Sequence, residues 1–345
     1  MNALSSVFAV VGYYEPWWIQ ILKAVIIFAI GLQLVPVVLI VERKLLGRFQ
    51  HRPGPNRVGP FGMLQPLADI LKLLTKEDFR PRTSVGFIFA LAPIISIITA
   101  VAAWAIIPFS NTQDIFGVQV GFYGVDPSVG VLYAFAFGAI AFYGLMLGGW
   151  ASGSKYSFLG AMRSAAQLIS YEVSQGLALV GVIMMAGTLS LTEIVEVQQA
   201  NTWFIIPQFV GFLIFLIAGF AETNRAPFDL PEADAELVGG YSTEYGGGRF
   251  ASFFFAEYLN ILVVSGLTVT IFLGGWDIPF WDGEPGWLHP FVVLGKMSAF
   301  VFFFIWIRAT LPRLRYDQLM SFGWKILLPL ATLNALVTAI LVVLI

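Results

Sequence analysis

The sequence WWIQILKAVIIFAIGLQLVPVVLIV occupies residues 17–41 and contains a single charged side chain, that of Lys23. A helix needs about 20 apolar residues to cross the hydrocarbon core of a bilayer, and this run is long enough. Seven further stretches share its character, at approximately 86–109, 127–150, 165–187, 204–221, 252–275, 290–310 and 325–345. Residues 17–41 therefore predict the first of eight membrane-spanning helices.

The composition agrees with this prediction. Of the 345 residues, 58% are hydrophobic and 12% are charged, and the mean hydropathy is +0.82. These values exclude an ordinary soluble domain and are typical of a polytopic membrane protein. Because the apolar runs are continuous and do not alternate with polar residues, they favour helices, and we expect no strands. The predicted fold is all-α, with a single membrane domain over residues 1–345.

The distribution of basic residues predicts the orientation. Residues 42–84 contain nine Lys and Arg, whereas the connections near 110–126, 188–203 and 276–289 contain none. Cytoplasmic loops are enriched in Lys and Arg. The loops at about 42–85, 151–164, 222–251 and 311–324 are therefore expected in the cytoplasm, with both termini outside. A cleavable signal peptide is not expected, because residues 1–16 lack a basic start.

The residue inventory excludes several cofactors. The chain has no Cys, so it holds no iron–sulfur cluster through thiolates. Its two His residues, His51 and His289, are predicted on opposite sides of the membrane, which excludes a haem held by both. No glycine-rich nucleotide motif follows a strand. Any redox cofactor is therefore expected in a partner, and no metal ligand set is predicted.

The first cytoplasmic loop contains a predicted amphipathic helix from Met63 to Lys76. Apolar side chains recur there at helical spacing, at Leu64, Leu67, Ala68, Leu71 and Leu74. Asp69 and Lys72 fall on another face. Such a helix lies along the membrane interface. It serves either as an anchor with solvated charges or as the wall of an opening for a lipid-soluble molecule.

The loop that follows the fifth apolar run is strongly acidic. Five carboxylates lie within residues 222–236: Glu222, Asp229, Glu232, Asp234 and Glu236. In a helix Glu232 and Glu236 would share a face, whereas in an extended segment all of the last three would converge. Two carboxylates about 5 Å apart repel by roughly 3 kcal/mol at an effective dielectric constant near 20. We therefore expect some of them to be protonated near neutral pH, as a proton store or a charge-sensitive switch.

Four ionisable residues fall within or at the ends of predicted spans. Glu172, Glu222 and Glu257 lie toward the cytoplasmic side, and Lys296 lies a turn or two from the outer face. Charges at membrane depth cost several kcal/mol and mark ion paths or buried pairs. We interpret Glu172 and Glu257 as part of a proton route. For Lys296, extension of the side chain to the outer interface is an equal alternative. No chain of acids reaches the outer surface.

Six segments of the chain match one family. They are ERK at 42–44, RPGPNRVGPFG at 52–62, WASGSKYS at 150–157, SYE at 170–172, PFDLPEADAELVGGYSTEY at 227–245 and IRATLPRLRYDQ at 307–318. Together they resemble the family of the H subunit, also called subunit 1, of proton-translocating NADH:quinone oxidoreductase, respiratory complex I. The likeness covers about residues 15–345.

The resemblance implies roles for particular residues. Those implied for quinone binding are Arg43, Asp69, Lys72, Phe228, Glu232, Asp234 and Glu236. Those implied for the proton path and coupling are Glu42, Glu172, Glu222, Arg225, Asp229 and Glu257. Counter-charges are implied for Arg308, Arg313 and Arg315. Two departures from the family stand out: Asp234 replaces a more usual Glu, and residues 138–139 are Gly and Ala where some relatives carry an acid.

The resemblance also implies the molecular setting. The chain would be part of a translocase in a bacterial cytoplasmic membrane, in contact with lipid and with other complex I subunits, and would bind no nucleic acid. Ubiquinone or menaquinone would be a substrate, and FMN and iron–sulfur clusters would belong to partners. Two alternatives are the homologous subunit of a membrane-bound hydrogenase and a stand-alone ion transporter. The lack of an internal inverted repeat disfavours the transporter.

Overall fold

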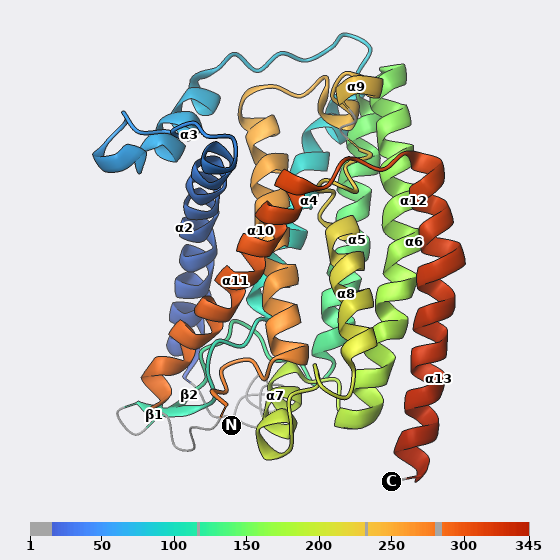
Figure 1. Cartoon of the computed structure of the whole chain (residues 1–345). Helices are drawn as coiled ribbons and strands as arrows, with labels where there is room; N and C mark the ends of the chain where they lie inside the picture. Colours follow the sequence, from blue (N-terminus) through green and yellow to red (C-terminus); the bar gives the residue numbers. More distant parts are fainter. Residues whose placement is uncertain (1–15, 116–117, 232–233, 280–284, 345) are drawn as a thin grey trace, which may run out of the picture.

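The computed structural model describes residues 16–115, 118–231, 234–279 and 285–344 (Figure 1). Its membrane helices are α2 (Trp17–Phe49), α4 (Gly86–Ala105), α5 (Gly130–Ala151), α6 (Lys155–Ala186), α8 (Phe209–Glu222), α10 (Gly247–Phe272), α11 (His289–Thr310) and α13 (Leu328–Leu344). Seven helical segments within these residues are long and apolar enough to cross a membrane, and α8 is a shorter apolar helix. The predicted all-α membrane fold is confirmed, with one helix in each predicted run.

The remaining elements lie at the two ends of the bundle. One end carries α3 (Gln65–Thr75), α9 (Asp234–Leu237), α12 (Tyr316–Phe322) and the 3₁₀ turns η2 (Pro60–Gly62) and η3 (Gly240–Ser242). The other end carries α7 (Leu191–Ala200), η4 (Gly286–Leu288) and the strands β1 (Gln113–Ile115) and β2 (Val118–Val120). The start of α2 and the end of α13 lie at this second end, as an even number of crossings requires (Figure 1). Which end faces the cytoplasm stays a prediction.

Several boundaries differ from the predictions. The expectation of no strands is wrong at β1 and β2, which form a short antiparallel hairpin with Gln113 opposite Val120. The loops are shorter than predicted, because α6 begins at Lys155, α10 begins at Gly247, and α12 continues through the π-helical turn η5 (Gly323–Leu327) into α13. The predicted amphipathic helix is confirmed as α3, with Pro66 in its first turn.

The centre of the bundle is α10. Its second half is buried on nearly every face, and it packs against α2, α3, α4, α7, α8 and α11. Close approach elsewhere depends on small residues: Trp104 of α4 donates its indole N–H to the Ile27 carbonyl of α2 (2.9 Å) and lies against Gly31. A Cβ atom at Gly31 would come within 2.8 Å of the Trp104 ring. This glycine therefore sets the α2–α4 distance.

Helix α8 is too short to cross the bilayer alone. It has 14 residues, which at 1.5 Å per residue span about 21 Å, against about 30 Å for the hydrocarbon core. The chain after it therefore continues inside the bundle. Thr223, Arg225, Phe228 and Leu230 are all buried. The short helix is the reason that a charged loop reaches membrane depth.

Lys296 closes the end of α10. Its ammonium group donates to the carbonyls of Leu273 (2.7 Å), Gly275 (2.9 Å) and Asp277 (2.7 Å) and lies 4.3 Å from the centre of the Trp203 ring. The last carbonyls of a helix have no partner within the helix. Lys296 supplies a donor to the cap residue Leu273 and to two carbonyls of the turn that follows, so it fastens the end of α10 to that turn.

Replacement of Lys296 with Met is expected to destabilise the protein by about 2 kcal/mol, because hydrogen bonds from a charged donor contribute on that scale. The measurement is the thermal unfolding temperature of the purified protein in detergent. Ser298→Ala in the same helix is the control, because that hydroxyl bonds a carbonyl of its own helix. An unchanged unfolding temperature for the Lys296 variant would mean that the ammonium group stays in water.

Candidate functional site

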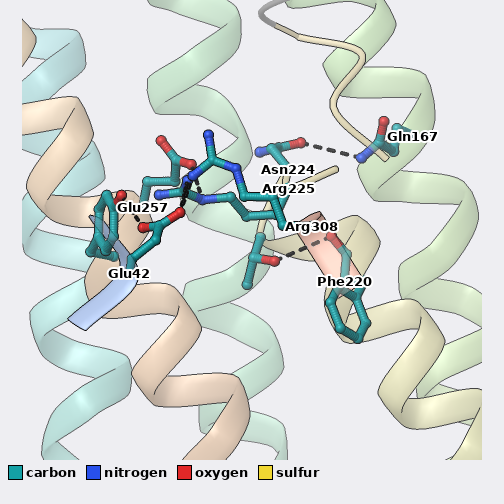
Figure 2. A network of polar contacts seen from close by, with 9 residues as sticks. Glu42, Gln167, Phe220, Asn224, Arg225, Glu257 and Arg308 are labelled. Atoms are coloured by element: carbon teal, nitrogen blue, oxygen red, sulfur yellow. Dashed lines mark hydrogen bonds and ion pairs between the residues drawn. The ribbon is translucent and has the colours of Figure 1, made fainter. Parts of the chain in front are cut away.

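Four charged side chains from distant parts of the chain meet between α2, α10 and α11. Glu42 comes from α2, Glu257 from α10, Arg308 from α11 and Arg225 from the loop after α8 (Figure 2). We call these four residues the ion-pair network. Arg225 Nε lies 2.6 Å from Glu257 Oε1, and its Nη1 lies 3.5 Å from Glu42 Oε1. Arg308 also pairs with Glu42.

The network is electrically balanced, and three of its four side chains are buried, whereas that of Arg308 is 38% exposed. The side chains of Glu42, Arg225 and Glu257 are 5%, 7% and 14% exposed, respectively. Tyr258 donates its hydroxyl to Glu42, and its ring lies 4.2 Å from the Arg225 guanidinium. Two carboxylates and two guanidinium groups cancel in charge. Pairing of this kind is what makes charges tolerable at membrane depth, so loss of any one member leaves a charge uncompensated.

A cavity lies next to the network, between α4, α5, α6, α8 and α10. Its volume is about 70 Å³, and the residues that line it include Glu172, Glu222 and Glu257. A space of this size holds several water molecules. Gln175 of α6 donates to Glu222 (2.9 Å). We call this space the acidic cavity.

Glu257 belongs to both features. Its carboxylate pairs with Arg225, and the residue is also one of those that line the acidic cavity. Within the described ranges, neither Glu172 nor Glu222 forms an ion pair with a Lys or Arg. The acidic cavity is therefore lined by two glutamates without a basic partner among the described residues, next to one that pairs with Arg225. This arrangement suits the exchange of protons coupled to the movement of a charge.

The acidic loop itself is only partly described. Glu232 lies outside the described residues, as does the side chain of Asp234, the first residue of α9. Asp229 lies within electrostatic range of Glu257. Phe228 is buried, with its ring centre 5.5 Å from that of Tyr171 in α6. The segment from Glu222 to Asp229 therefore runs against α6 and α10.

Glu236 differs from the sequence interpretation. It forms an ion pair with Arg163 near the start of α6, and its side chain is 45% exposed. The hydrogen bond from Arg163 lowers the pKa of Glu236 below its usual value, and the charges of Arg163 and Arg313 act in the same direction. Glu236 is therefore not one of the loop acids that the sequence led us to expect in the protonated form, and that expectation stays a prediction for the other acids of the loop.

The residues implied for quinone binding fall into two groups. Arg43 and Asp69 form an ion pair where α2 meets α3, and Lys72 is exposed on α3. Phe228 and Glu236 belong to the loop that contains α9, on the far side of the same end of the bundle (Figure 1). Among the residues that the structure describes, no ion pair or hydrogen bond joins the two groups.

Some residues of the site escaped the sequence analysis. Tyr258 directly follows Glu257 and bonds Glu42, while Gln167 and Gln175 bond the end of α8 and Glu222. The two glutamines are eight residues apart on one face of α6, and that spacing was the available signal. Of the implied counter-charges, Arg308 contacts Glu42, but Arg315 pairs with its neighbour Asp317 at 3.1 Å.

The structure is that of a polytopic membrane protein. In the described residues, its apolar helices pack around a network of glutamate and arginine side chains, so it holds charged groups within the bilayer. The chain belongs to the NADH dehydrogenase family, whose model matches residues 22–339. It is 53% identical to NADH-quinone oxidoreductase H subunit 1 of Geobacter metallireducens over 321 residues, which are 93% of this chain and 95% of that protein.

Other relatives extend the comparison. The chain is 53% identical over 302 residues to the NADH-quinone oxidoreductase H subunit of Thermomicrobium roseum, covering 85% of this chain and 87% of that protein. It is 49% identical over 330 residues to NADH-quinone oxidoreductase subunit 8 of Thermus thermophilus, covering 96% of this chain and 88% of that protein. The family resemblance predicted from the six segments is confirmed.

Proposed function

We propose that this chain is the membrane subunit of an NADH–quinone oxidoreductase that passes the effect of quinone reduction into the membrane as a proton movement. The observation that carries the proposal is the position of Glu257, shared between the Arg225 ion pair and the acidic cavity. Family membership and the names of the relatives support the same function. The chain would act with partner subunits that hold FMN and the iron–sulfur clusters.

The proposed sequence of events begins outside the cavity. Quinone from the membrane would take electrons from a partner near the acidic loop and α3, and the negative charge that forms would attract Arg225. Movement of Arg225 would leave Glu257 without its partner. A buried carboxylate without a partner binds a proton, because burial disfavours the charged form. Water in the acidic cavity would then carry protons among Glu257, Glu222 and Glu172.

The first experiment is to purify the tagged chain in mild detergent and to assay the isolate for inhibitor-sensitive NADH–quinone reductase activity. Activity in a large assembly that purifies with the chain is the expected result. A large assembly that reduces its acceptor with hydrogen or formate, and not with NADH, would indicate the hydrogenase-type alternative. A lone chain that transports ions would overturn the proposal.

Replacement of Glu236 with Gln is expected to lower coupled quinone reductase activity several-fold while the assembly stays intact, because Arg163 loses its charged partner at the proposed quinone site. The measurements are turnover with quinone and a native gel of the assembly. Asp317→Asn is the matched control, since it breaks the exposed Arg315–Asp317 pair in the connection after α11. Unchanged turnover and proton pumping in the Glu236 variant would count against the proposal.

A further inference from the structure

A single amide group fastens both ends of the loop that carries Arg225. Gln167 of α6 is fully buried, and its Nε2 donates at 2.7 Å to the carbonyl of Ala221 and at 2.7 Å to that of Phe228. Its Nε2 also lies 3.4 Å from Oδ1 of Asn224 (Figure 2). An amide nitrogen has two hydrogens, so the two short bonds use its full donor capacity.

The two carbonyls lie on either side of Arg225 in the chain. Ala221 precedes Glu222 at the end of α8, where helical carbonyls lack partners within the helix. Phe228 follows Arg225, and its own N–H donates to the Arg225 carbonyl at 2.8 Å. Because one amide holds both points, the backbone on either side of Arg225 cannot move independently of α6.

A backbone hydrogen bond also attaches the loop to the segment after α11. The N–H of Leu314, in the segment after α11, donates to the Pro227 carbonyl at 3.1 Å. That segment leads into α12, whose Leu319 carbonyl accepts the Tyr171 hydroxyl of α6 (2.9 Å). Both attachments therefore end on α6, one directly through Gln167 and one through α12. Gln167 is the direct one.

We propose that Gln167 is a positioning residue that holds the loop of Arg225 between α6 and α10, so that the Arg225 guanidinium stays in register with Glu257. The inference rests on the proposed function, in which displacement of Arg225 starts the proton movement. Among the described residues, the hydrogen bonds of Gln167 go to Ala221, Asn224 and Phe228 and not to the four side chains of the network. It determines how far and in which direction Arg225 moves when charge forms nearby.

The test uses the whole assembled complex with Gln167→Met and Gln167→Glu. Methionine keeps the length of the side chain and removes both donors, whereas glutamate keeps the shape and removes the paired donors. We expect kcat for quinone reduction to fall about tenfold, since misplaced groups lose rate steeply, while KM for quinone and electron transfer from NADH to a hydrophilic acceptor stay unchanged. Protons pumped per quinone reduced should fall as well.

If Gln167 had a purely structural role, its variants would assemble less well without a change in kcat. Gln198→Met is the control that is expected to show this behaviour. Gln198 of α7 is also buried and donates to the Thr270 carbonyl of α10 at 2.9 Å, away from the network. Its loss should reduce the amount of assembled complex and leave kcat and the pumping ratio per complex unchanged. If the Gln167 variants behave like Gln198→Met, or keep the wild-type kcat, the inference is wrong.

The outcomes separate this inference from the proposed function. A wild-type complex without NADH–quinone reductase activity would contradict both the proposed function and the inference. A fully active wild-type complex whose Gln167 variants pump and turn over normally would contradict the inference alone. A fall in kcat with normal KM and assembly would support both.

Discussion

Replacement of Arg225 with Met is expected to destabilise the protein by about 3–5 kcal/mol and to abolish coupled quinone reduction, because it breaks a buried ion pair from one side. Arg308 still pairs with Glu42 in this variant, so Glu257 is the carboxylate left without a basic partner. The measurements are thermal unfolding in detergent and quinone reductase turnover of whatever complex assembles.

A double variant makes this prediction specific. Arg225→Met combined with Glu257→Gln should recover much of the lost stability, because the orphaned charge is gone, but it should not recover coupled turnover. Arg315→Met is the matched control, and an exposed pair such as Arg315–Asp317 contributes about 0–1 kcal/mol. Wild-type stability in the single variant would show that Arg225 is not the counter-charge of Glu257.

Long apolar runs made the membrane helices predictable, because about twenty consecutive apolar residues have few other stable environments. The amphipathic helix α3 was predictable from the spacing of Leu64, Leu67, Leu71 and Leu74. These features depend on local sequence alone. They determined the fold class but could not give the lengths of helices whose ends lie inside the bundle, such as α8.

Two local elements at the end opposite α3 were not predicted from the sequence, namely α7 and the hairpin of β1 and β2. Helix α7 begins after Ser190, whose hydroxyl accepts the N–H of Glu193 (3.4 Å). Ser followed three residues later by Glu is a recognised start signal for a helix, so α7 was predictable. The hairpin of β1 and β2 has strands of three residues, which is too short for an alternation pattern to indicate.

The pairing within the network could not be read from the sequence. Glu42 and Arg308 are 266 residues apart, and nothing in the local sequence indicates that α2 and α11 bring them together. Glu222 and Glu257 were singled out because charges at membrane depth are costly. That argument identifies a buried charge but not its partner, so the division between the ion-pair network and the acidic cavity needed the structure.

Replacement of Glu222 with Gln is expected to lower coupled quinone reduction by about a hundredfold or more, on the scale of general acid–base contributions, with little change in stability. Glutamine keeps an acceptor for the Gln175 amide and has the same size as glutamate. The space that it needs is left open by Gly138, because a Cβ atom at residue 138 would lie 3.2 Å from Glu222 Oε1. What is lost is the carboxyl group that binds and releases a proton. The measurements are turnover and protons pumped per quinone reduced.

Two further variants decide whether the carboxyl group or the space matters. Glu222→Asp keeps a carboxyl group on a shorter side chain, and water in the acidic cavity can bridge the difference, so partial activity is expected. Glu193→Gln in α7 is the control at the opposite end of the bundle, where that carboxylate bonds Thr188, and it should leave turnover unchanged. Full activity in Glu222→Gln would mean that protons reach Glu172 without Glu222, and the proposed route would then have to run directly from Glu257 through cavity water.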